Sequence, residues 1–546
     1  MNGKPFHLSF GHFVEVPDGV RLHAAIYKNA EADKAPALLT LTPYTVGYVH
    51  NMASKLASAG FAVVVVDVRG RGDSGGLFDL YNDGKDGAAC VDWVAAQPWC
   101  NGDVALFGGS YAGLNQWAIA AQKPAALKAI APICAPMPGL DADGFNGLFP
   151  MNNLRWASFI RGRTLNRQLF DDDGFWKATF LDLYRKGSAI EDLRSALDDD
   201  SNVLAAIIEK FDKEGGWDAA VPGPQELQSI KVPALTMTGT ADNAQRGAIA
   251  YHERSKSDAP RWLVVGPWNH AGQRDPNPRP GAPETPASRV IDDIEFQTLL
   301  GFFKCALRGA ALPSILSAAE AIFIDGLETW IDLNSLPERS AKRFYPGDKY
   351  QLLDHRPETQ VSFSLVQPSS KLSHGEQEIA QDGADLFDIL GGEKSDDTWH
   401  VSAQDEAGFV CLSAPLESDM VFLGRPSAKL TVTTTVPEVA IYVLIFFQAP
   451  NGDTRIISSD ARALNTDPGS ANKVSFDSFR FGSSLIGRGS RIGVKIALVD
   501  SPAFASLPAV PPQGHQETSL SFGEDDHQSI ELPLFKPDEV ARAKII

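Results

Sequence analysis

Ser110 stands at the corner between a predicted strand and a predicted helix, within the segment DVALFGGSYAGLNQWAIAAQ. A serine neither extends the strand nor strengthens the helix, so its place at this corner calls for a chemical reason. Gly108 and Gly113 flank it closely. This is typical of a nucleophile elbow, in which a strained backbone pushes the serine hydroxyl out over the sheet. In isolation, the same pattern is more often a serine that caps the following helix.

A serine nucleophile needs a base, and in the elbow arrangement an acid and then a histidine follow it along the chain. The predicted strand VPALTMTGTAD ends at Asp242, and the predicted strand RWLVVGPWNH ends at His270. Because the carboxyl ends of parallel strands meet at one edge of a sheet, we expect Ser110, Asp242 and His270 to form a catalytic triad. Asp141 and Asp143 follow the strand ALKAIAPICA and are alternative acids. Asp242 is preferred because it lies directly at a strand end.

Attack by Ser110 on a carbonyl carbon would create an oxyanion, which needs at least two hydrogen-bond donors. The backbone N–H of Tyr111, the residue after the serine, is the first expected donor. The second must come from the loop after the predicted strand ALLTLTP, and this loop begins with Tyr44. The phenol of Tyr44 would serve if it pointed back over the sheet. A packed Pro-Tyr turn is the alternative reading of the same residues.

The elements that must position these residues follow from the hydrophobic pattern. The first third of the chain alternates short apolar runs, such as residues 35–44 and 60–70, with helix-like segments at residues 83–99 and 111–122. This alternation predicts a parallel sheet covered by helices. Residues 139–228 have irregular helical patterns rich in aromatic and acidic residues, which indicates an inserted helical cap.

Two further strands and an amphipathic helix, IDDIEFQTLLGFFKCAL, would complete the sheet. After these, short strand-like runs recur between turns, as in a β-sandwich. The patterns therefore divide the chain into the first part of an α/β core, a helical cap, the second part of the core and a C-terminal β-sandwich, at residues 1–138, 139–228, 229–312 and 313–546.

Composition narrows the class of partner. The formal net charge is −19 and no run of Lys and Arg occurs, which argues against a nucleic acid or an anionic membrane as partner. The five cysteines are widely spaced without a CxxC pair, so we expect buried thiols rather than disulfides or a zinc site. Neither a signal peptide nor a membrane span of about 18 apolar residues is recognisable. We therefore expect a soluble, cytoplasmic protein, either a monomer or a homo-oligomer.

Several motifs together resemble the CocE/NonD hydrolases, a family that includes cocaine esterase, α-amino-acid ester hydrolases and X-Pro dipeptidyl-peptidases. The motifs are PYTVGY, VVVDVRGRGDSGG, DGAACVDWVAAQPWCNGDVALFGGSYAG, TGTAD and GPWNHAG. The resemblance implies an α/β-hydrolase core, a helical cap and a C-terminal jelly-roll. It also implies Ser110 as nucleophile, Asp242 as acid and His270 as base, with Tyr44 and the Tyr111 amide as oxyanion hole. No metal or organic cofactor is implied.

One departure from the family concerns the acyl group. Relatives that cleave aromatic esters often carry a bulky aromatic residue shortly after the acid, whereas this chain has Asn243 and Ala244 there. The acyl pocket is therefore expected to be roomier or lined differently.

The leading hypothesis is a serine hydrolase that cleaves a small-molecule carboxylic ester or an activated amide through an acyl-enzyme. An X-Pro type dipeptidyl-peptidase, or another aminopeptidase, is the second enzyme reading. It would need carboxylates in the cap to hold a free α-amine. A catalytically inactive ligand-binding protein is the third reading, and the complete set of Ser, Asp, His and Tyr argues against it.

Overall fold

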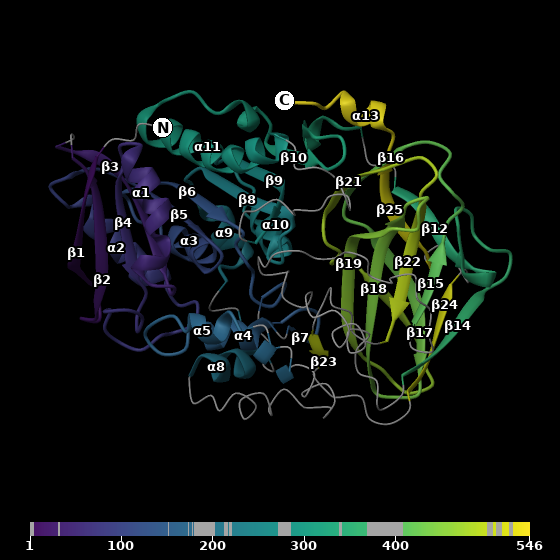
Figure 1. The fold of residues 1–546 in the computed structure, drawn as a ribbon. Coiled ribbons are helices and arrows are strands. Elements are labelled where there is room, and N and C mark those ends of the chain that lie inside the picture. The colour runs from purple at the N-terminus through teal and green to yellow at the C-terminus, as the bar shows by residue number, and fades with distance from the viewer. Residues whose placement is uncertain are drawn as a thin grey trace.

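The computed structural model places three regions side by side (Figure 1): an α/β region, a group of helices below it and a β-rich C-terminal region. The residues that the structure describes are 5–30, 33–142, 144–150, 152–172, 174–176, 178–179, 202–211, 217, 221–270, 286–337, 341–367, 408–498, 506–508, 516–522 and 528–545.

The α/β region is built on a sheet whose strand order is β1-β2-β4-β3-β5-β6-β8-β9-β10-β11. Neighbours from β4 to β10 pair in parallel, and β1, β2 and β11 pair antiparallel at the two edges. The strands are β1 (Phe6–Glu15), β2 (Arg21–Asn29), β3 (Ala35–Thr42), β4 (Ala62–Asp67), β5 (Cys100–Gly109), β6 (Leu127–Ile133), β8 (Ala234–Ala241), β9 (Arg261–Asn269), β10 (Glu320–Ile324) and β11 (Thr329–Asp332).

Helices cover both faces of this sheet. Val64 and Val66 of β4 belong to one apolar cluster with residues of α2, α3 and α10, whereas Val63 and Val65 belong to another with residues of α1 and α11. Successive side chains of a strand point to opposite faces, so the unbroken valine run reflects burial on both sides. The helices are α1 (His50–Ser58), α2 (Gly84–Ala95), α3 (Tyr111–Ala121), α9 (Pro224–Ser229), α10 (Gln245–Arg254) and α11 (Pro286–Arg308).

The cap lies on one side of the α/β region, below it in Figure 1. Its described helices are α4 (Asn152–Phe159), α5 (Arg167–Phe170) and α8 (Asn202–Phe211). The short strand β7 (Leu148–Pro150) precedes them and pairs antiparallel with β23 (Ser506–Pro508), so the cap is tied to the C-terminal region. The cap sequence includes three consecutive aspartates at residues 198–200, which lie outside the described residues.

The described residues of the C-terminal region form mainly β-strands, with one short 3-10 turn and a last helix. Its main path of paired strands runs β14-β24-β17-β25-β12-β13-β15-β22-β18-β19, and β16, β20 and β21 pair off this path. These elements are β12 (Ala341–Gly347), β13 (Gln351–Leu353), β14 (Val361–Gln367), β15 (Gly408–Leu412), β16 (Met420–Gly424), β17 (Ser427–Thr434), β18 (Glu438–Gln448), β19 (Thr454–Asn465), β20 (Ala471–Phe476), β21 (Gly482–Ile486), β22 (Arg491–Ala497), β24 (Gln516–Phe522), β25 (Ile530–Phe535) and α13 (Pro537–Ala541).

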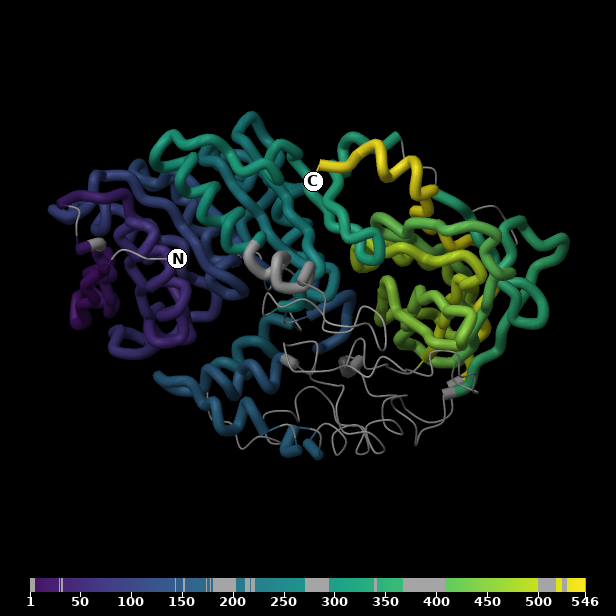
Figure 2. Tube along the Cα trace, turned by 45° about the horizontal axis from the view of Figure 1, so that its top comes forward, coloured from purple at the N-terminus to yellow at the C-terminus, as the bar shows by residue number. Residues whose placement is uncertain are grey.

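The first sheet extends past residue 312, where the sequence pattern predicts the C-terminal domain to begin. Strand β10 pairs in parallel with β9, and β11 pairs with β10, so the first sheet continues to Asp332. Ile322 and Ile324 of β10 share an apolar cluster with Val421 and Phe481 of the C-terminal region. The two regions therefore have a common core, and Figure 2 shows them lying against each other.

The described residues bear on the expectations about membrane spans and cysteines. None of the described helices combines the length and the apolar character needed to cross a membrane. Cys90, Cys100, Cys134 and Cys411 are buried free thiols, and Cys305 is half-buried.

Candidate active site

Ser110 occupies a strained turn between β5 and α3. Its backbone has φ 58° and ψ −125°, a region that costs a non-glycine residue about 1–3 kcal/mol. The flanking glycines are required by close contacts. A Cβ on Gly108 would come within 2.7 Å of Ala112 Cβ, and a Cβ on Gly113 within 2.7 Å of the Ile133 carbonyl oxygen. The turn therefore has the geometry of a nucleophile elbow.

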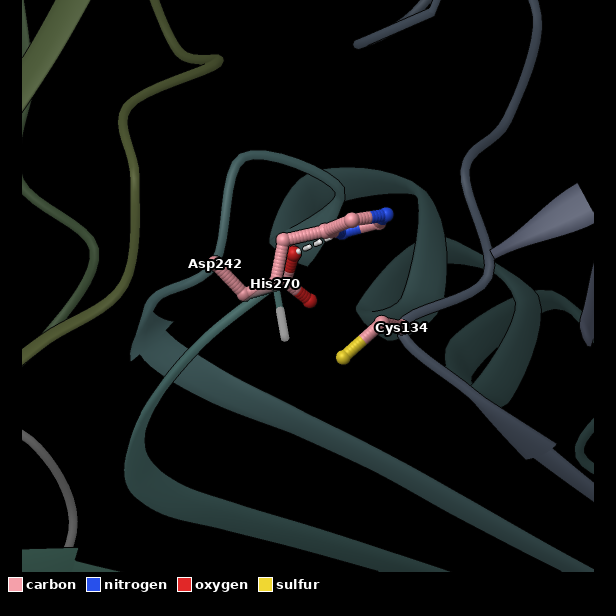
Figure 3. A group of neighbouring side chains, drawn as sticks. All are labelled: Cys134, Asp242 and His270. Carbon is pink, nitrogen blue, oxygen red and sulfur yellow. Dashed lines mark hydrogen bonds and ion pairs between the residues drawn. The ribbon is translucent and has the colours of Figure 1, made fainter. Parts of the chain in front are cut away.

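Ser110, His270 and Asp242 form one chain of hydrogen bonds. His270 directly follows β9, and its Nε2 lies 2.9 Å from Ser110 Oγ. Its Nδ1 lies 2.7 Å from Oδ1 of Asp242, which directly follows β8 (Figure 3). The structure thus brings together, at the carboxyl ends of three strands, the three residues selected from the sequence.

The carboxylate of Asp242 is held by further donors. Its Oδ1 accepts a hydrogen bond from the backbone N–H of Ala244 at 2.9 Å, and its Oδ2 accepts one from Thr238 Oγ1 at 2.6 Å. The residue is fully buried, with 0% of its surface exposed. A buried carboxylate with this many donors has a fixed orientation, so it fixes the orientation of the His270 ring.

Burial and charge act in opposite directions on this pair. Burial alone would lower the pKa of His270, but the facing carboxylate of Asp242 raises it above its ordinary value. Burial alone would raise the pKa of Asp242, but the charge and hydrogen bond of His270 bring it below its ordinary value. The pair therefore favours a charged carboxylate beside a histidine that accepts a proton readily.

Tyr44 points to the nucleophile from the loop after β3. Its hydroxyl lies 3.4 Å from Ser110 Oγ, and Trp156 Nε1 donates a hydrogen bond to the same hydroxyl at 3.1 Å. Burial raises the pKa of Tyr44, against the effect of hydrogen bonds with Ser110, Trp156 and the backbone of Tyr111. The phenol therefore keeps its proton, and its hydroxyl lies close to the reacting oxygen. This geometry agrees with the expected donor role better than with a packed Pro-Tyr turn.

The side chain of Tyr111, the residue after Ser110, makes two hydrogen bonds next to the elbow. Its hydroxyl accepts a hydrogen bond from the backbone N–H of Tyr81 at 3.0 Å. It also hydrogen-bonds to Asp83, whose pKa is raised to about 7, mainly by burial. The hydrogen bonds among Tyr81, Asp83 and Tyr111 lie next to Ser110 but do not include it. The sequence pattern does not predict them.

The alternative acid Asp141 has a different role in the structure. Its Oδ1 accepts a hydrogen bond from the backbone N–H of Met137 at 2.8 Å, and its Oδ2 accepts one from Gly247 at 2.6 Å. Both carboxylate oxygens of Asp141 therefore accept hydrogen bonds from backbone N–H groups, whereas the carboxylate of Asp242 contacts His270. Asp143 lies outside the described residues.

A possible metal-ligand set overlaps this pair. Cys134, Asp242 and His270 each offer one donor atom, and these atoms lie within 4.8 Å of one another (Figure 3). Sulfur, nitrogen and oxygen ligands suit zinc. However, His270 Nδ1 and both oxygens of Asp242 are already hydrogen-bonded, and burial raises the pKa of the Cys134 thiol well above its usual value. The arrangement favours proton transfer by His270 over metal binding.

Two family models match the chain. The model described as X-Pro dipeptidyl-peptidase (S15 family) matches residues 18–272. The model described as X-Pro dipeptidyl-peptidase C-terminal non-catalytic domain matches residues 316–531. The two matches follow each other along the chain and together span most of it. The resemblance drawn from the sequence motifs is thereby confirmed, as is the combination of an α/β-hydrolase core with an all-β C-terminal domain.

Relatives of this family share the fold over most of the chain. The cocaine esterase of Rhodococcus sp. (strain MB1 Bresler) is 27% identical over 364 residues, which span 61% of this chain and 61% of that protein. An aminopeptidase structure from a marine sediment Thaumarchaeota archaeon has a TM-score of 0.80 at 18% identity, covering 98% of this chain and 97% of that one. An α-amino-acid ester hydrolase structure has a TM-score of 0.76 at 18% identity, covering 97% of each chain.

Proposed function

We propose that this chain is a serine hydrolase that cleaves small-molecule carboxylic esters through an acyl-enzyme on Ser110. The observation that carries the proposal is the hydrogen-bonded chain from Ser110 Oγ to His270 Nε2 and from His270 Nδ1 to Asp242, with distances of 2.9 and 2.7 Å. The match to the model of a hydrolase family and the similarity to a cocaine esterase support the same chemistry.

In the proposed mechanism, His270 takes the proton of Ser110 as its oxygen attacks the ester carbonyl. Asp242 stabilises the imidazolium that forms. The Tyr44 hydroxyl and the Tyr111 backbone N–H donate hydrogen bonds to the oxyanion of the tetrahedral intermediate. His270 then gives its proton to the leaving alcohol, and the same steps with water release the acid and free Ser110.

The surroundings of Tyr44 favour an apolar acyl group. Its ring lies 5.1 Å from the ring of Tyr48 and 5.9 Å from that of Phe159, and Trp156 binds its hydroxyl. Of these rings, that of Tyr48 is the exposed one, so it offers apolar surface beside Tyr44. Hydrolysis of an activated amide would use the same steps, with an amine as the leaving group.

An X-Pro type dipeptidyl-peptidase is the competing proposal, and the family description supports it. Such an enzyme must bind a free α-amine, for which carboxylates are the natural partners. Of the acids described near the triad, Asp141 binds two backbone N–H groups and Asp83 is buried beneath Tyr111. The ester proposal therefore has the better support from the described residues.

A first experiment tests the nucleophile. A fluorophosphonate probe should label wild-type protein at Ser110, and Ser110→Ala should abolish both labelling and ester hydrolysis without a loss of thermal stability. Activity that persists in this variant would refute the assignment. Absence of labelling in the wild type would favour an inactive binding protein.

A second experiment separates the two enzyme proposals. Purified protein is given matched substrates with a free or a blocked α-amine, alongside simple aryl and alkyl esters. Turnover of the simple and N-blocked esters supports the ester proposal. Turnover confined to X-Pro substrates with a free amine would replace it with the peptidase.

A further inference from the structure

The turn that carries Asp242 is held from outside the hydrolase core. Arg480 lies in the loop between β20 and β21 of the C-terminal region. Its Nη2 donates a hydrogen bond to the backbone carbonyl of Asp242 at 2.6 Å and a longer one to that of Thr240 at 3.4 Å. A guanidinium bound to the carbonyl of the triad acid restricts the backbone position of that acid.

The next residue of the same loop holds the other side of the turn. The side chain of Gln245 accepts a hydrogen bond from the backbone N–H of Phe481 at 2.7 Å and donates one to the Phe481 carbonyl at 3.0 Å. It also donates to Gly239 at 3.0 Å, at the end of β8. Gln245 is buried, with 1% of its surface exposed, so these bonds are not exchanged for water.

Arg246 makes a third set of contacts between the Asp242 turn and the C-terminal region. Arg246 donates hydrogen bonds to the backbone carbonyls of Ser478 at 2.6 Å and of Ser459 at 2.8 Å. The C-terminal region thus binds the segment from Thr240 to Arg246, the segment that contains the triad acid.

We propose that Arg480 is a positioning residue for the catalytic triad, so that the C-terminal domain takes part in catalysis by holding Asp242 in line with His270. The inference rests on the proposed function. It goes beyond that function because it gives a role in the reaction to a domain whose family description is non-catalytic.

The charge of Arg480 adds a second effect to the position it imposes. His270 faces the carboxylate of Asp242, the hydroxyl of Ser110 and, at longer range, the carboxylate of Asp141. Arg480 interacts electrostatically with both carboxylates, and it also faces Arg246. Its positive charge offsets part of the negative field at the histidine. Removing that charge should raise the pKa of His270, because the imidazolium would be less repelled.

The test compares three variants of the full chain. Arg480→Met removes the charge and the donors, and Arg480→Lys keeps the charge but loses the fork of the guanidinium. Arg261→Met is the matched control, because Arg261 also binds backbone carbonyls, those of Ile230 and Val232, at 2.7 and 2.8 Å. Burial lowers the pKa of Arg261, and its hydrogen bonds go to backbone carbonyls rather than to a carboxylate.

The readouts are kcat and KM for an ester, the melting temperature, and the pH dependence of fluorophosphonate labelling of Ser110. Arg480→Met should lower kcat by roughly 10- to 100-fold with little change in KM, because a displaced triad acid impairs chemistry rather than binding. A small shift of the turn leaves the Asp242 carboxylate facing the His270 ring, so the lost Arg480 charge should dominate. The acid limb of the labelling profile should then move up by roughly 0.5 to 1 pH unit. Arg480→Lys should keep the limb near its wild-type position, and Arg261→Met should lose stability alone.

A fourth variant tests the inference if Arg480→Met does not fold. Gln245→Met removes the hydrogen bonds between the Asp242 turn and the Phe481 backbone without changing any charge. It should therefore lower kcat and leave the acid limb in place. An Arg480 variant with a wild-type limb and wild-type kcat, or a Gln245 variant with normal kcat, would overturn the inference. If wild-type Ser110 were not labelled at all, the proposed function would fail, and this inference with it.

Discussion

The indole N–H of Trp156 donates a hydrogen bond to the hydroxyl oxygen of Tyr44, with 3.1 Å between the two atoms. Trp156 belongs to α4 of the cap, whereas Tyr44 follows the central strand β3 of the core. Because the indole occupies a lone pair of the phenol oxygen, it leaves the phenol proton to point elsewhere. Ser110 Oγ, 3.4 Å away, is the partner next to the expected position of the oxyanion. The cap therefore contacts the candidate active site through Tyr44.

Removal of the Tyr44 hydroxyl should impair the chemical step. Tyr44→Phe keeps the ring and its contacts but loses the donor, so kcat should fall by about 10² to 10³, as for the loss of one oxyanion-hole donor. Steady-state kinetics measures this, with the melting temperature as the control for folding. A kcat within a fewfold of the wild type would assign both donors to backbone amides.

The acid of the triad is tested by an isosteric change. Asp242→Asn should lower kcat by about 10⁴, because the amide no longer fixes the tautomer of His270 that accepts the serine proton. Asp141→Asn is the control. It disturbs hydrogen bonds to the Met137 and Gly247 backbone but does not touch the histidine, so its main effect should be on stability. The reverse outcome, with the larger loss in Asp141→Asn, would show that Asp141 is the acid.

The pH profile follows from the sign of the His270 shift. The neutral imidazole is the active form, so kcat/KM should be lost as the pH falls through the pKa of His270. That pKa is raised above the ordinary 6.5, mainly by the Asp242 carboxylate against the opposing effect of burial. The acid limb should therefore have its midpoint above pH 6.5. An activity that stayed constant down to about pH 4 would exclude a histidine base.

The geometry of the candidate site could largely be predicted because its parts follow local rules. Strands β3 and β4 are mostly apolar and buried at every position, and Asp242 and His270 stand directly after the largely buried strands β8 and β9. In a parallel sheet, the ends of these runs meet at one edge, so local pattern is enough to bring distant residues together.

The remainder depends on contacts that local pattern does not encode. Trp156 lies 112 residues from Tyr44, and Arg480 lies 238 residues from Asp242. Neither pair has a spacing that a motif could express. The sequence pattern does not predict β1, at one edge of the sheet, and it places β10, next to the other edge, in the C-terminal domain. β1 is only partly buried, and the short run EAIFI of β10 looks like any strand of the following β-sandwich.

The hydrogen bond between Trp156 and Tyr44 should contribute to catalysis through Tyr44 alone. Trp156→Phe removes the donor while keeping an aromatic ring in contact with Tyr81 and Tyr111. If the bond orients the phenol proton, kcat should fall by roughly 3- to 10-fold, the worth of one hydrogen bond.

The double variant decides whether the two side chains act together. With Tyr44 already changed to Phe, there is no hydroxyl left to orient, so adding Trp156→Phe should lower kcat no further. The control is Trp176→Phe. This tryptophan also lies in the cap, where its indole donates to the Leu169 carbonyl at 2.8 Å, and its loss should reduce stability without changing kcat. Multiplied losses in the double variant would mean that Trp156 acts on the reaction by a route that does not pass through Tyr44.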